Sequence, residues 1–163
     1  HLSIRRQRQM CIRDRTGTET SADLDAHPGL IDRLNEIRLK AGQLMGLGDV
    51  TDSVIPKPVL LGKHDDALSI HSRYFTPKKC HTSHAVTGAI GLASAFVLPG
   101  TVANNSDIPP GDHVVNICHP SGKIQIALKV KLNEGEIALE RASVVRTVRK
   151  IMQGDLVIPP KVN

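Results

Sequence analysis

The chain has 163 residues, a formal net charge of +5, 40% hydrophobic residues and 2% aromatic residues. This length suits one domain with a sizeable core, and no apolar run reaches the roughly 18 residues that a membrane span needs. One Tyr, two Phe and no Trp leave little surface on which nucleic-acid bases could stack, which argues against a nucleic-acid-binding protein.

Most of the net positive charge lies in residues 1–15, which hold five arginines against one aspartate. This segment lacks the long apolar run of a secretory signal and the serines of a transit peptide. Its stretch QRQMCIRDR is the translation of the end of a common transposase sequencing adapter. We therefore interpret residues 1–15 as a sequencing artefact joined to a truncated reading frame, and residues 16–163 as the domain. A nucleic-acid-binding arm is the alternative, and its salt-sensitive DNA binding would disappear when residues 1–15 are removed.

The first part of the domain predicts a polar connector over residues 16–27 and then a packing helix over 28–46. Pro28 suits the first turn of this helix, and Gly46 suits its end. Apolar residues recur at three- and four-residue steps, which places them on one helix face. They are Leu30, Leu34, Ile37, Ala41 and Leu44.

Strands are expected within residues 55–62 and over residues 68–75, where apolar and polar residues alternate. Residues 84–98 carry no charge after His84 and are apolar on every side, which predicts a helix enclosed by other structure. Thr82 or Ser83 is expected to cap its start. The small residues of this helix would let neighbouring backbone approach closely.

The rest of the chain predicts strands over residues 113–119, 123–132, 137–149 and 155–159, because β-branched and alternating patterns are separated by turn residues. The order is helix, strands, one buried helix, then strands. This order predicts an α+β domain whose sheet curls around a central helix.

The start of the predicted buried helix is a candidate anion site. A helix N-terminus offers free backbone N–H groups and a positive dipole, to which a carboxylate or phosphate can bind. The alternative is a solvated turn with ordinary capping residues. The polar residues gathered there are Lys78, Lys79, His81, Thr82, Ser83 and His84.

Two other patterns give weaker evidence for a functional site. A zinc site is disfavoured because the soft ligands lack the close pairing of zinc motifs. The stretch HPSG (residues 119–122) fits an ordinary turn. The alternative interpretation is a turn whose residues also contact a ligand. The ligand types considered for zinc are Cys80, His81, His84, Cys118 and His119.

Several stretches together resemble the C-terminal half of the 2-methylaconitate cis–trans isomerase and 4-oxalomesaconate tautomerase family, the PrpF-like proteins. The resemblance covers residues 16–162, and it rests on the order and spacing of the motifs. These motifs are LNEIRLKAGQLMGLG, PKPVL, HAVTGAIGLASAFVLPGTV, HPSGKIQI and VVRTVRKIMQGDLVIP.

The resemblance implies a diaminopimelate epimerase-like fold: a curled, mostly antiparallel sheet around one buried central helix, as one of the two domains of a parent enzyme. It implies a cofactor-free proton shift in an unsaturated tricarboxylate. Ala85 stands where the related epimerases carry a catalytic cysteine, which disfavours a two-cysteine mechanism. The family's proton-transfer residues would lie in the missing N-terminal domain, so we expect no catalytic residue here and little turnover by this chain alone.

The same resemblance implies four substrate contacts: Lys57, Ser83, His84 and Ser121. The expected partners are a small polycarboxylate and the missing N-terminal domain, with a homo-oligomer left open and no membrane, nucleic acid, metal or cofactor. Cys80 and Cys118 lack CxxC spacing, which favours a reducing, cytoplasmic location. The alternative function is a non-catalytic binding domain that reuses the same fold.

Overall fold

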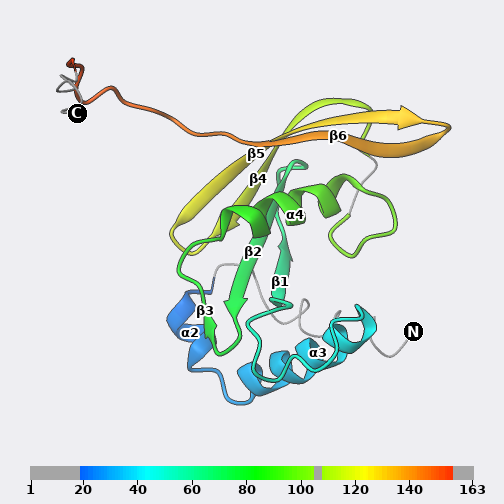
Figure 1. Cartoon of the computed structure of the whole chain (residues 1–163), viewed down its shortest axis with the longest axis vertical. Coiled ribbons are helices and arrows are strands. Elements are labelled where there is room, and N and C mark those ends of the chain that lie inside the picture. The colour runs from blue at the N-terminus through cyan, green and yellow to red at the C-terminus, as the bar shows by residue number, and fades with distance from the viewer. Residues whose placement is uncertain (1–18, 105–107, 156–163) are drawn as a thin grey trace, which may run out of the picture.

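The computed structural model describes residues 19–104 and 108–155 (Figure 1). Within these ranges the chain forms a mixed α+β domain, as the sequence predicts. The helices are α2 (Ser21–Asp25), α3 (Leu30–Leu44) and α4 (Val86–Val97). The strands are β1 (Val59–Lys63), β2 (Ser69–Thr76), β3 (Lys79–Cys80), β4 (Gly111–His119), β5 (Gly122–Asn133) and β6 (Glu136–Val144).

The sheet runs in the order β1-β2-β4-β5-β6, and the two-residue β3 pairs with β2. All strand pairs described are antiparallel except β2 with β4. Parallel neighbours cannot be joined by a tight hairpin, and α4 lies in the long connection between them. The expectation of a mostly antiparallel sheet is therefore confirmed.

Helix α4 packs against one face of the sheet (Figure 1). Its buried residues are Ala89, Leu92, Ala93, Phe96 and Val97. The prediction that this helix is enclosed on every side is wrong, because Val86, Thr87 and Gly91 are exposed. These residues belong to the first half of the helix, so the N-terminal part of α4 is open to solvent on one side.

Strand β2 is buried on both faces, and the side chains on its two faces belong to different hydrophobic cores. Ile70 joins the main core with α4, β4 and β5. Phe75 points to the other side and joins a small second core formed by residues of α2, α3 and β3. Successive side chains of a strand point to opposite faces, so one strand serves both cores.

Helix α3 forms where the apolar spacing predicts it, and Gly46, with φ 72°, lies just beyond its end. Helix α2 was not predicted, because residues 16–27 read only as polar. Thr20 accepts a hydrogen bond from the N–H of Asp23, and Asp23 accepts one from the N–H of Thr20, so the two residues form a capping box. Leu24 then fixes this short helix by lying fully buried in the second core.

Strand β6 ends at Val144, so the prediction of one strand up to residue 149 is wrong. Residues 145–155 form an extended segment that leaves the sheet, here called the C-terminal arm (Figure 1). The predicted strand over 155–159 and the interpretation of residues 1–15 fall almost entirely outside the described residues. Among the helices described, none combines the length and hydrophobicity needed to cross a bilayer.

Candidate functional site

A groove of about 410 Å³ lies at the N-terminal end of α4. Helix α4 provides one side of it, and the segment leading into β1 provides the other. Tyr74 of β2 lies between them. The lining residues are Ile55, Lys57, Val59, Tyr74, Thr87 and Gly88.

The start of α4 is open toward a ligand. Its N-cap is Ala85, with φ −67° and ψ 136°, and no side chain caps the first turn. The prediction that Thr82 or Ser83 provides the cap is therefore wrong. In the first turn of a helix the backbone N–H groups lack intrahelical acceptors and the dipole is positive. Thr87 and Gly88 of this turn line the groove, which suits a carboxylate.

Lys57 is the predicted contact that lines this groove. Its Nζ lies 5.7 Å from the centre of the Tyr74 ring. A cation at this distance from an aromatic face is attracted by the ring quadrupole. Lys57 and the first turn of α4 thus both bring positive charge to the lining of one groove.

His84 is buried, with 7% of its surface exposed, and both of its ring nitrogens have partners. Nδ1 lies 3.0 Å from the Ala85 carbonyl oxygen, and Nε2 lies 3.0 Å from Ser72 Oγ. A carbonyl can only accept, so Nδ1 carries the proton and the Ser72 hydroxyl donates to Nε2. Burial lowers the pKa of His84, which keeps the ring neutral.

His84 therefore supports the groove from within the protein. Its ring packs 4.7 Å from the Tyr74 ring, measured between centroids. Gly88 lies against both rings: an added Cβ would stand 2.6 Å from Tyr74 Cε2 and 3.3 Å from His84 Cε1. Glycine at this position is what allows Tyr74 to approach the helix. Tyr74 and Ser72 are not among the residues predicted from the sequence, although Tyr74 is the single Tyr of an aromatic-poor chain and could have been noticed for that reason.

Ser83 and Ser121 do not line the groove. The hydroxyl of Ser121 donates to the carbonyl oxygen of Thr82, which fastens the β4–β5 turn to the segment before α4. The N–H of Ser83 donates to His81 Nδ1 at 3.0 Å. The four predicted contacts thus lie near the start of α4, and Lys57 is the one that lines the groove.

Cys80 and Cys118 are poorly suited to act as bases or nucleophiles. Burial, reinforced by the nearby Asp25 carboxylate, raises the pKa of the Cys80 thiol to about 11. Burial also raises the pKa of Cys118. A thiol must lose its proton to react, so both thiols are held in the inactive form at neutral pH. Across residues 19–104 and 108–155, no three His, Cys, Asp or Glu residues are grouped so that they could hold a metal ion.

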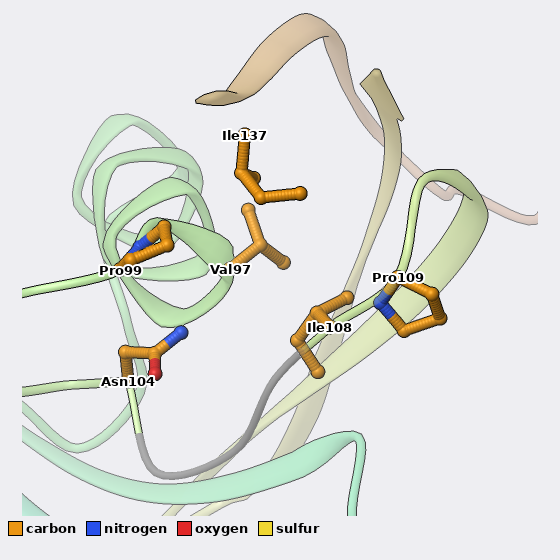
Figure 2. Close-up of a pocket in the computed structure, with 6 residues that line it drawn as sticks. All are labelled: Val97, Pro99, Asn104, Ile108, Pro109 and Ile137. Carbon is orange, nitrogen blue, oxygen red and sulfur yellow. The ribbon is translucent and has the colours of Figure 1, made fainter. Parts of the chain in front are cut away.

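Another cavity, of about 290 Å³, lies at the opposite end of α4 (Figure 2). Figure 2 shows Val97, Ile108 and Ile137 around its interior. The Asn104 amide donates to the Phe96 carbonyl oxygen at 2.9 Å and is thus already engaged. This apolar surface does not suit a polycarboxylate, in contrast to the groove at the helix start.

Comparison with known proteins gives a consistent family. The sequence model of the PrpF protein family matches residues 12–159. "Putative isomerase YbhH" of Escherichia coli (strain K12) is 46% identical over 146 residues, which cover 89% of this chain and 41% of that protein. The "(4E)-oxalomesaconate Delta-isomerase" of Novosphingobium sp. (strain KA1) is 36% identical, over 85% of this chain and 39% of that protein. The chain therefore spans about two fifths of the length of these curated relatives.

A solved structure is similar in fold. The structure of a methylitaconate-delta-isomerase superposes with a TM-score of 0.59 and 22% sequence identity. The match covers 82% of this chain and 40% of the other. At this identity the likeness concerns the fold alone.

Proposed function

The chain belongs to the PrpF family, and from this premise we propose that it is the substrate-binding half of a cofactor-independent isomerase. The reaction shifts a proton and a double bond in an unsaturated tricarboxylate, the class to which oxalomesaconate and 2-methylaconitate belong. The α+β domain is then one of two diaminopimelate epimerase-like domains, with α4 as its central helix. Two unpaired thiols support a cytoplasmic location for this enzyme.

The groove at the start of α4 is the observation that carries this proposal. Lys57 supplies an ammonium group, and the uncapped first turn of α4 supplies backbone N–H donors. Ile55 and Val59 add apolar contact area for the carbon skeleton. A polycarboxylate requires this combination, because charged carboxylates need donors while the carbon chain needs apolar surface.

The proposed role of the groove in the reaction is to stabilise charge. Removal of an allylic proton leaves an enolate-like charge that spreads onto a neighbouring carboxylate. Fixed donors directed at that carboxylate lower the energy of the transition state. Lys57 and the first turn of α4 are the donors that we assign to this task.

Proton transfer itself is assigned to the part of the longer relatives that this chain does not span. His84 has both ring nitrogens engaged, and the Cys80 and Cys118 thiols keep their protons. A general base must be within reach of the substrate proton and in its basic form. We therefore expect this chain to bind a tricarboxylate and to convert none.

Binding is tested by titrating the purified chain with tricarballylate, a saturated tricarboxylate that cannot isomerise, in a calorimeter. Lys57→Met should weaken binding about tenfold, the loss expected for one hydrogen bond to a charged group. Lys63→Met is the matched control, because Lys63 is exposed at the far end of β1 and does not line the groove. Equal affinities of the two variants would overturn the placement of the ligand.

Turnover is tested separately by incubating the chain with cis-aconitate and following the olefinic protons by NMR. The expected result is an unchanged spectrum. Isomerisation that disappears in the Lys57→Met variant would overturn the assignment of proton transfer to another part of the enzyme. Tight binding of tricarballylate without turnover would agree with both the proposed half-enzyme and the non-catalytic binding domain. Co-expression with the remaining half of a relative distinguishes these two, because only the half-enzyme should then gain isomerase activity.

A further inference from the structure

Loop 50–55, which joins α3 to the segment of Lys57, forms one wall of the groove. Ile55 of this loop lines the groove beside Lys57. Four other residues of the loop line a neighbouring cavity of about 510 Å³ on its far side. They are Thr51, Asp52, Ser53 and Val54. Within the loop, the N–H of Ser53 donates to the Val50 carbonyl oxygen at 3.0 Å, and the N–H of Ile55 donates to Ser53 Oγ at 3.3 Å.

The Arg38 guanidinium ties this loop to α3. Nη1 donates to the carbonyl oxygens of Val50 at 2.7 Å, Ser53 at 2.9 Å and Ile55 at 3.2 Å. Nη2 donates to the carbonyl oxygen of Thr51 at 3.3 Å. Arg38 thus binds four carbonyl groups within six consecutive residues, and its own helix orients it through Nε, which donates to Asn35 Oδ1 at 3.0 Å.

Arg38 is buried, with 3% of its surface exposed. In the part of the chain that the structure describes, no carboxylate lies within ion-pair distance of it. The carbonyl dipoles of loop 50–55 therefore compensate its charge. Burying a guanidinium is expensive unless its donors are satisfied, so the energy that keeps Arg38 buried depends on the loop keeping this conformation.

Gly42 lies one turn after Arg38 on the same face of α3 and makes a second, independent contact. An added Cβ at Gly42 would stand 2.5 Å from Val50 Cγ2 and 3.0 Å from Val50 Cγ1. Only glycine allows Val50 to pack this closely on the helix. Arg38 and Gly42 lie four residues apart on one face of α3. Arg38 thus holds most of the carbonyl groups of the loop, and Gly42 holds the side chain of Val50, the first residue of the loop.

We propose that α3 is a positioning element for the substrate groove, in which Arg38, assisted by Gly42, fixes loop 50–55 and so places Ile55 and Lys57. Arg38 touches no ligand and is a positioning residue. This inference rests on the proposed function of the groove. The sequence alone predicts that this helix only packs on the domain, and the inference adds a positioning role to it.

The first test needs no ligand. Tyr74 is the only Tyr and the chain has no Trp, so the intrinsic fluorescence reports on the groove wall. Tyr74 is 6% exposed, and Ile55 and Lys57 lie beside it. Arg38→Met should release the loop and raise the acrylamide quenching constant of Tyr74 several-fold, measured well below the unfolding temperature. Arg33→Met is the matched control, because Arg33 is an exposed residue of the same helix, where it pairs with Glu36.

An unchanged quenching constant in folded Arg38→Met, with only a lower unfolding temperature, would overturn the positioning role. If Arg38→Met does not fold, Gly42→Ala replaces it, since the added methyl group pushes Val50 and leaves the guanidinium intact. Gly42→Ala should raise the quenching constant, and the double variant Gly42→Ala/Val50→Ala should restore it by making room. Failure of Val50→Ala to restore it would likewise overturn the proposal.

The second test is a double-mutant cycle on tricarballylate affinity with Arg38→Met and Lys57→Met. If Arg38 acts by placing Lys57, the double variant should bind as weakly as Lys57→Met alone, with Arg38→Met itself about tenfold weaker than wild type. Fully additive losses would contradict action through Lys57. If the wild-type chain binds no tricarballylate, the proposed function fails, and the quenching result still decides whether α3 positions the loop.

Discussion

At the scale of single residues, the groove depends on the packing beneath it as well as on its lining. His84, predicted as a substrate contact, is buried with its two ring nitrogens hydrogen-bonded to Ala85 and Ser72, and its contact with substrate stays a prediction. Lys57 keeps its place in the groove beside Tyr74. None of the six polar residues predicted as an anion site just before α4 lines the groove. The sequence pattern could not show this, because the groove depends on contacts of α4 with Tyr74 of β2 and on the segment that leads into β1.

Gly88→Ala should destabilise the domain and disturb Tyr74. The added Cβ meets Tyr74 Cε2 at 2.6 Å, so the ring must move, at a cost of about 1–3 kcal/mol for an overpacked site. Gly91→Ala is the matched control within the same helix, because no atom lies within 4 Å of its added Cβ. That control should stabilise α4 by about 0.5–1 kcal/mol. Urea unfolding measures both values, and equal signs for the two variants would contradict the packing of Tyr74 on Gly88.

The free energy of unfolding should fall as the pH drops below about 6.5, the ordinary pKa of histidine. Burial lowers the pKa values of His71, His84 and His119 in the folded protein. The unfolded chain therefore binds more protons in this range, which favours unfolding at acid pH, and the loss ends once the folded histidines are protonated too. His84→Gln should reduce the slope of unfolding free energy against pH between neutral and acid solution. An unchanged slope in urea titrations would show that His84 titrates normally.

At the scale of elements, patterns of apolar residues predicted α3, α4, β2, β4 and β5 close to their observed positions, by helical spacing for α3, by an uncharged apolar stretch for α4 and by β-branched or alternating residues for the strands. Helix α2 was missed, since its five residues are too short for a periodic signal and depend on the Thr20–Asp23 capping box and on Leu24. The C-terminal arm shows the opposite error. Its β-branched residues favour a strand, but no neighbouring strand pairs with residues 146–149 among those described.

Trypsin should cut the C-terminal arm before it cuts the sheet. Arg146, Arg149 and Lys150 lie in an extended, exposed segment. Lys123 and Lys129 lie in β5, which is paired with β4 and β6 on its two sides. A protease binds an extended chain, so paired strands must first open. Mass spectrometry of a short digestion series measures the order, and equally early cleavage within β5 would contradict the register of this sheet.

At the scale of the whole molecule, exposed apolar side chains include two groups that concern the missing part of the longer relatives. Val54, Ile55 and Val86 are exposed around the groove, and Val148, Ile151 and Met152 are exposed on the C-terminal arm. Val148 and Ile151 are 93% and 92% exposed. Exposed apolar groups that gather in patches mark surfaces that bind another protein or associate with each other. We propose that the remaining half of the enzyme covers these surfaces in the longer relatives.

The isolated chain should therefore self-associate as its concentration rises. The double variant Val148→Ser/Ile151→Ser should shift the equilibrium toward the monomer, because it removes the two most exposed apolar side chains of the arm. Val102→Ser is a control for loss of an exposed valine outside the arm and away from the groove. Sedimentation equilibrium measures the distribution. A wild-type chain that stays monomeric at high concentration would contradict a role of the arm in association.

The α+β class, the positions of the long elements and the family follow from the sequence alone, because these depend on local periodicity and on the order of several motifs. Contacts across the fold are needed to show that Lys57 lines the groove while the polar residues just before α4 do not, that α4 begins without a side-chain cap, and that Arg38 holds loop 50–55. These features depend on atoms far apart in the chain. Arg38 meets carbonyl groups 12 to 17 residues away, and Ser121 meets Thr82 across 39 residues, a pairing that no local pattern records.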